Sequence, residues 1–228
     1  MESTVSRRRF FTTATAAAAV PVFTRSANAT PGKTLIIGVA CSPRKGKTTS
    51  TAVGAALKAA ESVNPEIETE LIDLGDMDIS GWVGGAKPDQ MAEIMDDFDL
   101  ILPSFQAPNL GGLIIGSPVY FRSMSALCKA FLERLAVLRK PEFKLADVPV
   151  AALAVGSYRN GGQELVIEQI VTAMLCHEVF VVGGKPRAHQ GATLWNAYDD
   201  DITQDELGMT SARNVGIRVA EAALKVKS

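Results

Sequence analysis

Short apolar segments alternate with amphipathic ones along almost all of the chain from Lys33 onward. Residues 34–40 are apolar after the first position, which is typical of a strand that is buried on both faces. Between residues 52 and 63 the apolar side chains recur at helical spacing, and Asn64-Pro65 ends that helix before a second strand over residues 67–72. This beginning of the chain predicts a βαβ unit.

The same alternation predicts the rest of the fold. Three more strands are expected at residues 113–116, 148–155 and 179–182, with one helix whose apolar face runs from 124 to 138 and another helix over 164–176. Apolar strands separated by helices require a parallel sheet that right-handed crossovers cover on both faces. The predicted fold class is therefore α/β, with one doubly wound domain.

Two segments depart from this alternation. Residues 74–112, between the second and third strands, are irregular, and we interpret them as an insertion beside the site with an acidic helical piece over 91–99. Near the C-terminus, Thr203 and Glu206 form a capping-box pattern, which predicts the start of a last helix that runs through Val226.

Charge and cysteine content exclude several classes of protein. The formal net charge is −2 at pH 7, and no stripe of Lys and Arg alternates with aromatic residues, so nucleic-acid binding is not expected. The three cysteines, Cys41, Cys128 and Cys176, include no CxxC pair, so neither a zinc nor an iron–sulfur motif is present. The acidic run at residues 199–201 is interpreted as a solvated turn rather than a metal site.

The first 29 residues have the organisation of an export signal. Arg7-Arg8-Arg9 precedes a weakly apolar run rich in Ala and Thr, and Ala27-Asn28-Ala29 offers a small-residue cleavage site. The segment resembles a twin-arginine signal, and Pro21 interrupts a run that is too short to span a bilayer. We expect residues 30–228 to form the mature domain, exported to the periplasm and without stable membrane insertion. Loss of four Arg and one Glu would move the formal charge from −2 to −5.

The loop after the first strand is a candidate phosphate site. Residues 41–49 lead from that strand into a helix, where free backbone N–H groups and the helix dipole favour an anion. Hydroxyls donate to phosphate oxygens and cations supply charge. The candidate residues combine both kinds of side chain with one glycine: Ser42, Arg44, Gly46, Lys47, Thr48 and Thr49.

Two other interpretations of this loop stay open. Gly46-Lys47-Thr48 matches the end of a nucleotide-hydrolysing P-loop, although Cys41 stands where that pattern needs its first glycine. The third strand also ends in Gly116-Ser117 rather than in an Asp that would help hold magnesium. In the second interpretation, the Ser and Thr side chains simply cap the helix.

Two later loops make the prediction more specific. Residues 116–125 read GSPVYFRSMS, and residues 156–164 read GSYRNGGQE. Together with Ser42-Pro43-Arg44 they resemble the three flavin loops of the NADPH-dependent FMN reductase and iron–sulfur flavoprotein families. The resemblance extends from about Lys33 to the end of the chain. It implies a flavodoxin-like, five-stranded parallel sheet in the order 2-1-3-4-5 with FMN as cofactor.

The resemblance also implies which residues surround the isoalloxazine ring. The second loop would wrap the ring with Pro118, Val119, Tyr120, Phe121, Arg122, Ser123 and Met124, and the third would close its other side with Ser157, Tyr158, Asn160, Gly161 and Gly162. Tyr120 and Phe121 would provide aromatic cover or else pack on the sheet as loop anchors. Arg122 departs from the small residue that relatives commonly carry, and the cysteine cluster of the iron–sulfur branch has no counterpart here. An FMN-only member is therefore expected.

The predicted activity is that of an oxidoreductase with no catalytic side chain of its own. FMN would take electrons from NAD(P)H or another small-molecule donor and pass them to a quinone, nitro, azo or metal-type acceptor. The alternatives are a non-catalytic flavodoxin-like electron carrier and, less favoured, a P-loop hydrolase. His189 is a further candidate, either as a proton donor or as an exposed loop histidine. Relatives of this kind suggest a homodimer or homotetramer.

Overall fold

The parallel sheet expected from the apolar runs is present in the computed structural model, which describes residues 32–83, 85, 90, 94–197 and 199–227. Its strands are β1 (Thr34–Ala40), β2 (Ile67–Asp73), β3 (Leu110–Pro118), β4 (Pro149–Gly156), β5 (Phe180–Val181) and β6 (Ala192–Trp195). The order is β2-β1-β3-β4-β5, and every pair is parallel. This confirms the predicted fold class and strand order.

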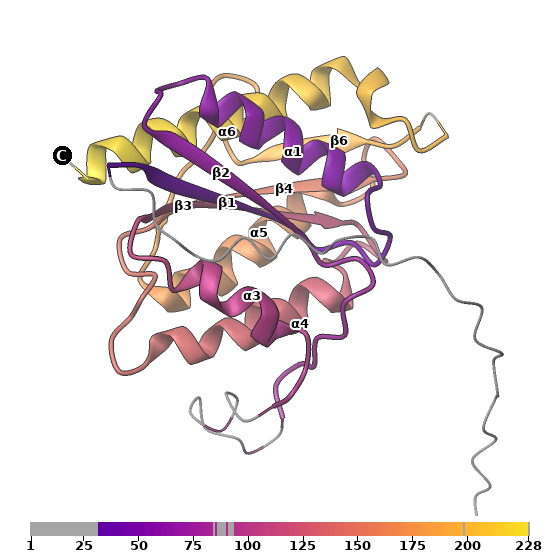
Figure 1. Ribbon diagram of the computed structural model, residues 1–228. Coiled ribbons are helices and arrows are strands. Elements are labelled where there is room, and N and C mark those ends of the chain that lie inside the picture. The colour runs from indigo at the N-terminus through magenta and orange to yellow at the C-terminus, as the bar shows by residue number, and fades with distance from the viewer. Residues whose placement is uncertain (1–31, 84, 86–89, 91–93, 198, 228) are drawn as a thin grey trace, which may run out of the picture.

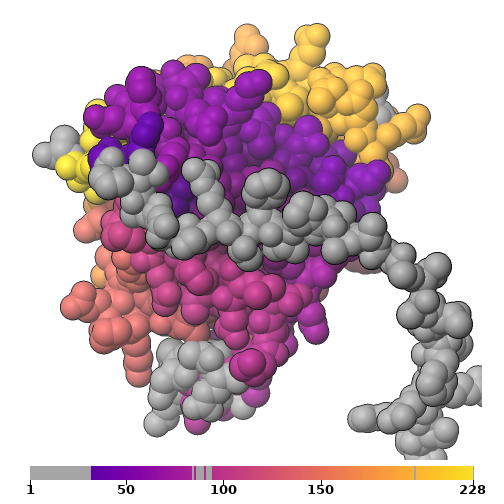
Figure 2. Space-filling model, viewed as in Figure 1, coloured from indigo at the N-terminus to yellow at the C-terminus, as the bar shows by residue number. Residues whose placement is uncertain are grey.

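Helices cover both faces of the sheet, as Figure 1 shows. Alpha helices α1 (Thr48–Glu61) and α6 (Glu206–Lys227) lie on one face, and α3 (Phe98–Phe105), α4 (Ala126–Arg134) and α5 (Gln163–Met174) lie on the other. In the space-filling view, the purple side chains of α1 and the yellow ones of α6 share the upper half of the visible face (Figure 2). Among the described residues, no helix combines the length and hydropathy that a membrane span requires.

Alternate residues of the strands pack into two separate hydrophobic cores, one on each face of the sheet. On β3, Ile114 packs in the core beneath α1 and α6, whereas Leu113 and Ile115 pack with α3, α4 and α5. On the first of these faces helix α1 comes very close to the sheet, because Gly38 has no side chain: a Cβ there would lie 2.5 Å from Val53 Cγ1. The close approach brings the start of α1 directly against the end of β1, where the first candidate loop lies.

The predicted fifth strand, residues 179–182, is only partly correct. The structure has β5 over two residues, followed by a loop and then β6, and both strands pair with β4. Gly191, with φ at +126°, and two further glycines in the intervening loop let the chain leave the sheet and return to it. Strand β6 was not predicted because four residues are too few for a clear periodic signal.

The predicted capping box of the last helix is wrong. Thr203 lies in a short 3-10 turn, and its backbone N–H and hydroxyl both donate to Asp201. Asp205 caps α6 instead, because its carboxylate accepts from the backbone N–H of Gly208 at 3.1 Å. The same carboxylate accepts from the N–H of Trp195 at 2.7 Å, so one side chain joins the end of β6 to the start of α6.

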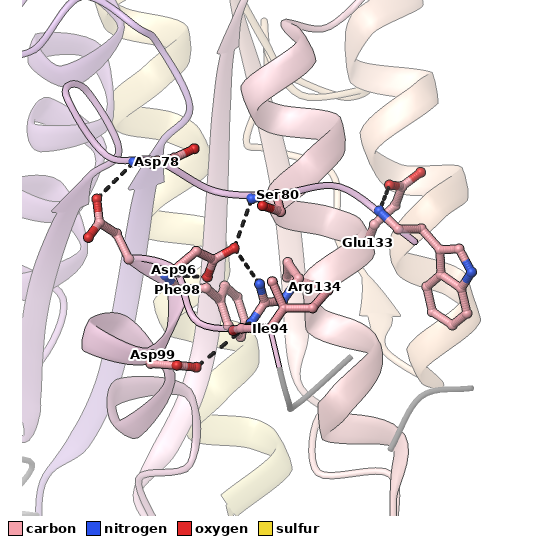
Figure 3. A network of polar contacts seen from close by, with 10 residues as sticks. Asp78, Ser80, Ile94, Asp96, Phe98, Asp99, Glu133 and Arg134 are labelled. Atoms are coloured by element: carbon pink, nitrogen blue, oxygen red, sulfur yellow. Dashed lines mark hydrogen bonds and ion pairs between the residues drawn. The ribbon is translucent and has the colours of Figure 1, made fainter. Parts of the chain in front are cut away.

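The irregular segment after β2 is held to the body of the protein by a buried arginine. Its predicted helical piece, residues 91–99, lies partly outside the described residues, and the described helix here, α3, begins only at Phe98. Arg134 of α4 is fully buried, forms an ion pair with Asp96 and has its guanidinium 4.8 Å from the Phe98 ring centroid. Figure 3 shows how Asp96 also accepts from the backbone N–H of Ser80 and Phe98.

Candidate functional site at the carboxyl edge of the sheet

The three predicted loops meet at one edge of the sheet. Residues 41–47, 119–125 and 157–162 leave the carboxyl ends of β1, β3 and β4, at the right-hand side of Figure 1. Because the strands are parallel, their carboxyl ends share an edge, and strand order reverses between β1 and β3. We call these segments loops one, two and three. Residues 196, 197 and 199–205, after β6, reach the same edge, where Asp200 pairs with Arg44 of loop one.

Loop one is shaped by the end of the neighbouring strand. Gly46 has a φ of +66°, and its N–H donates to the carboxylate of Asp73, the last residue of β2, at 2.7 Å. The other Asp73 oxygen accepts from Gly75 N–H at 3.0 Å. Gly75 in turn lies so close to Lys45 that a Cβ added to Gly75 would be 2.4 Å from the Cα of Lys45. The turn into α1 is therefore preformed by protein contacts.

The start of α1 has polar groups that the protein does not satisfy. The N-cap residue Lys47 makes no side-chain capping bond, and Thr48, Thr49 and Ser50 are all buried. Thr49 is only 1% exposed, and its hydroxyl oxygen has no hydrogen-bond partner among the described residues. An orphaned buried hydroxyl beside an open helix N-terminus fits a phosphate that is not part of the protein. The interpretation as a mere helix cap finds no support in these contacts.

Arg44 has a partner that the sequence did not reveal. Its guanidinium forms an ion pair with Asp200 at 2.8 Å, and Asp200 also accepts from the Asn196 side-chain amide at 2.9 Å. The hydrogen bonds from Asn196 and Arg44 lower the pKa of the Asp200 carboxyl, and the nearby Lys47 charge adds to this. The run at 199–201 is thus more than a solvated turn, because it holds Arg44 from outside loop one. Ser42 is buried, and its oxygen accepts from Arg44 N–H at 3.2 Å.

Loop two is a tight turn with exposed aromatic side chains. Tyr120 and Ser123 exchange two backbone hydrogen bonds of 2.9 Å, and the two residues between them, Phe121 and Arg122, have φ values of +50° and +62°. Phe121 is fully exposed, so it does not anchor the loop on the sheet, and Tyr120 is also exposed. The anchors are instead the ends of the loop. Val119 N–H donates to the Val155 carbonyl at 2.8 Å, directly after Pro118 ends β3.

Two serines that were not predicted join loops one and two. The hydroxyl of Ser125 donates to the carbonyl of Cys41 at 2.6 Å and accepts from Cys128 N–H at 3.0 Å, which makes it the N-cap of α4. Its own N–H donates to Ser117 Oγ at 3.0 Å. The position of Ser125 before a predicted helix was a usable capping signal, whereas its bond to Cys41 depends on the fold.

The other end of loop two is fastened to α5. The side-chain oxygen of Gln169 accepts from Ser123 Oγ at 2.9 Å and from Met124 N–H at 3.0 Å. Gln169 was not among the predicted residues. It orients the last two residues of the predicted ring-binding segment.

Loop three contacts loop two directly. Gly162 has a φ of +110°, and a Cβ there would lie 3.1 Å from Arg122 Cα, so only glycine allows this approach. The buried Gln163 closes the loop, because its amide donates to the Tyr158 carbonyl at 2.6 Å and its oxygen accepts from Gly161 N–H at 2.9 Å.

The tip of loop three stays open to solvent. Ser157, Tyr158 and Asn160 are exposed, and the Ser157 carbonyl accepts from the indole N–H of Trp195 at 3.1 Å. The structure therefore brings together all three predicted loops, and it adds Trp195 of β6 to their surroundings.

Cys41, the first residue of loop one, is buried and is not a reactive thiol. Burial is the main reason that the pKa of the Cys41 thiol is raised well above its usual value, and its contact with Cys128 adds to the shift. A buried neutral thiol is a poor nucleophile. Among the described residues, no cluster of three His, Cys, Asp or Glu side chains could hold a metal ion. That the chain carries no iron–sulfur cluster stays a prediction from its cysteine positions.

Comparison with known proteins agrees with the arrangement of the loops. The model of the NADPH-dependent FMN reductase family matches residues 34–192. An iron–sulfur flavoprotein of Methanocaldococcus jannaschii is 38% identical over 195 residues, which cover 84% of this chain and 98% of the relative. An iron–sulfur flavoprotein of Methanosarcina thermophila is 35% identical, and the match covers 73% of this chain and 85% of the relative.

Solved structures with low sequence identity show the same fold. RosB, solved with a bound 8-demethyl-8-formylriboflavin-5′-phosphate intermediate, has a TM-score of 0.64 at 16% identity, over 86% of this chain and 80% of RosB. A WrbA-like flavodoxin from Agrobacterium tumefaciens has a TM-score of 0.57 at 16% identity, and the match covers 85% of this chain and 98% of the flavodoxin. The fold is flavodoxin-like and the predicted cofactor, FMN, agrees with the family match. The chain belongs to the NADPH-dependent FMN reductase family.

Proposed function

We propose that this chain is an exported FMN-dependent oxidoreductase that passes electrons from NAD(P)H or another reduced donor to a quinone, nitro, azo or metal-type acceptor. The observation that carries the proposal is the unsatisfied hydroxyl of Thr49 at the open N-terminus of α1. Loops two and three lie at the same sheet edge, where open α/β sheets bind ligands.

Loop one would hold the FMN phosphate. Thr49 and the first backbone N–H groups of α1 would donate to phosphate oxygens, together with the hydroxyls of Ser42 and Thr48. Gly46 would shape the turn instead, because its N–H already donates to Asp73. Arg44 and Lys47 would supply positive charge. Since Asp200 already holds Arg44, that arginine is oriented before the phosphate arrives, while its own charge is partly balanced.

Loops two and three would place the ring. FMN supplies reversible uptake of electrons, and the protein contributes position, backbone donors and cover. The exposed aromatic rings of Tyr120, Phe121 and Tyr158 are available as cover, and the Gly162 to Arg122 contact keeps the two loops together. In the overall reaction, the donor loses two electrons, and a quinone acceptor gains two electrons and two protons.

The proposed location limits the electron donor. Residues 1–29, which resemble a twin-arginine signal, lie outside the described residues, and export to the periplasm is part of the proposal. NAD(P)H belongs to the cytoplasm, so a quinol or another exported carrier would suit an exported enzyme better. We also propose that the domain works as a homodimer or homotetramer with small-molecule substrates.

A visible spectrum of the purified chain tests the cofactor assignment. We expect flavin absorbance in the protein as isolated, or after FMN is added to the apoprotein, and nanomolar to micromolar binding by fluorescence quenching. Riboflavin, which lacks the phosphate, is the matched control ligand and should bind far more weakly. A chain that binds neither compound would refute the proposal.

Stopped-flow spectroscopy then separates an enzyme from an electron carrier. The bound flavin is mixed with NADPH, NADH or a reduced quinone, and bleaching is followed. Rapid bleaching followed by many turnovers on a quinone supports the oxidoreductase. Bleaching only by a reduced protein partner, with no turnover on small acceptors, would favour the carrier instead.

A further inference from the structure

Two adjoining cavities lie next to loop three. Most of the residues that line them are not among those predicted to bind the flavin. One, of about 430 Å³, is lined by residues that include Arg122 of loop two, Arg159 and Gly162 of loop three, and Leu165. The other, of about 300 Å³, is lined by residues that include Arg187, Trp195 and Ser211. Arg159, Gln163 and Thr193 line both. Volumes of this size suit small-molecule ligands.

Arg159 is held in place where the cavities meet. Its guanidinium lies over the Trp195 ring, 4.3 Å from the ring centroid. Trp195 is itself fixed at both ends, because its indole N–H donates to Ser157 and its backbone N–H donates to the Asp205 carboxylate. The positive charge is thus positioned by stacking and not by an acidic partner.

Among the residues that the structure describes, the three arginines around these cavities have no acidic partner. The ion pairs between described residues involve other basic side chains, and none of them includes Arg122, Arg159 or Arg187. The two acidic residues of the lining are engaged elsewhere: Asp205 accepts backbone N–H groups, and Glu164 accepts from the side-chain amide of Gln190 at 3.2 Å. These carboxylates keep their charge, so three arginines against two carboxylates give the lining a formal net charge of +1.

Arg187 is also on an anchored segment. The carbonyl of Pro186, next to it, accepts from the Asn214 side chain of α6 at 2.8 Å, and Lys185 N–H donates to the Asn214 carbonyl at 3.3 Å. Its φ of +79° is unusual for an arginine and fixes the backbone direction at this point. Arg187 thus lines the second cavity from the segment between β5 and β6.

We infer that Arg159, with Arg122 and Arg187, forms a binding site for the anionic group of an electron-transfer substrate. The substrate's redox-active ring would lie beside the loop-two and loop-three residues, and its sulfonate, carboxylate or phosphate would lie between the arginines. Arg159 and Arg187 are assigned as specificity residues, since Arg122 is shared with the proposed ring site. The inference rests on the proposed function and names the chemical class of its substrate.

Substrate pairs that differ by one anionic group test this inference. In the oxidative half-reaction, naphthoquinone sulfonate is compared with neutral naphthoquinone. In the reductive half-reaction, NADPH is compared with a neutral benzyl dihydronicotinamide. In at least one half-reaction, Arg159→Gln and Arg187→Gln should each lower the anionic-to-neutral ratio of kcat/KM by about ten-fold or more. The half-reaction that responds identifies the substrate that carries the anion.

The controls keep charge and surface effects apart. Arg159→Lys should recover part of the ratio, and Arg213→Ala, on the exposed side of α6, should leave both the ratio and the activity unchanged. Calorimetric titration with naphthalenesulfonate gives a readout without turnover, and we expect about ten-fold weaker binding by Arg159→Gln and weaker binding by the wild type at high salt.

Failure of the inference differs from failure of the proposed function. Unchanged ratios in both half-reactions, with unchanged naphthalenesulfonate affinity in the variants, would overturn the anion site while a flavin-loaded, active protein is still present. A protein without flavin would instead refute the proposed function.

Discussion

Arginine has opposite surroundings in two regions of this molecule. Between α3 and α4, Arg134 is completely buried, paired with Asp96 and covered by the Phe98 ring. At the carboxyl edge of the sheet, Arg122 and Arg159 are exposed, and among the described residues they have no ion pair. The first region pairs its buried positive charge with a carboxylate, although Arg134 Nε has no hydrogen-bond partner among the described residues, and the second leaves its arginine charges unpaired.

The difference indicates that the first region contributes to folding stability and the second to ligand binding. A buried charge without a partner costs several kcal/mol, so the α3–α4 region must supply its own counter-charge in order to fold. At the loop edge, the unmatched groups include the buried hydroxyl of Thr49, which costs about 1–3 kcal/mol in the free protein, and solvated cations, whose cost is small. Such groups are available to a ligand. Stability should therefore respond to changes in the first region and ligand binding to changes in the second.

The largest effect is expected from Arg134→Met. Loss of the guanidinium leaves the Asp96 carboxylate buried without its counter-charge, which should lower the free energy of unfolding by about 3–5 kcal/mol. Urea denaturation followed by circular dichroism measures this. The control is Lys129→Met on the same helix, whose exposed pair with Glu133 should contribute less than about 1 kcal/mol. A loss below about 1 kcal/mol for Arg134→Met would remove the contrast between the two regions.

Thr49→Val should act on FMN and not on folding. Valine keeps the shape but removes a buried hydroxyl that makes no hydrogen bond within the described protein, so the free energy of unfolding of the apoprotein should stay the same or rise. Loss of a hydrogen bond to a charged phosphate should weaken FMN binding by about 1.5–3 kcal/mol, which fluorescence titration detects.

Thr51→Val is the matched control on the same helix. Thr51 is exposed, and its hydroxyl donates back to the Lys47 carbonyl at 3.3 Å, so FMN affinity should not change. If Thr49→Val instead destabilises the apoprotein and leaves FMN affinity unchanged, Thr49 belongs with the structural polar groups of the first region.

His177 offers a smaller effect, which depends on pH. Burial, together with the charge of Arg139, lowers its pKa to about 4, whereas an unfolded histidine titrates near 6.5. A lowered histidine pKa means that the unfolded chain takes up the proton first. The contribution to stability is therefore complete above about pH 6.5 and is lost as pH falls toward 4, by about 1–3 kcal/mol in total.

Unfolding free energies at several pH values between 7.5 and 4.5 test this for the wild type and His177→Gln. The variant should lose less stability on acidification than the wild type. His189→Gln, which removes an exposed histidine, serves as the control. Parallel pH curves for the wild type and His177→Gln would show that this buried histidine contributes nothing to acid sensitivity.

Much of the fold could be predicted because its signals are local. The first strand was predicted with the bounds that the structure has, Thr34–Ala40, since a run that is apolar after its first residue leaves little choice. Helix α6 was expected, but its cap was assigned to Thr203 although Asp205 provides it. Both residues are good N-caps by composition, and the contact of Asp205 with Trp195 decides between them.

The residues of the candidate site likewise divide into those that the sequence predicted and those that it did not. The residues of loop one were predicted from local chemistry, because a strand end followed by Gly, Ser and Thr at a helix start favours an anion. Those of loops two and three were implied by the resemblance of short motifs to a known family. Arg159, Gln169 and Asp200 were missed, since their partners lie 36, 46 and 156 residues away in the pairs formed with Trp195, Ser123 and Arg44. No local pattern marks such contacts.

Apolar periodicity and loop composition were thus sufficient for the class of fold and the edge where the loops gather, and the family resemblance supplied the order of the strands. Only the packed structure distinguished the paired arginine, Arg134, from the unpaired one, Arg159. The reason is that the spacing of apolar residues can be recognised within any short stretch of the sequence. Whether a charge is buried, matched or left open depends instead on which distant segments the sheet and helices bring within a few ångströms of it.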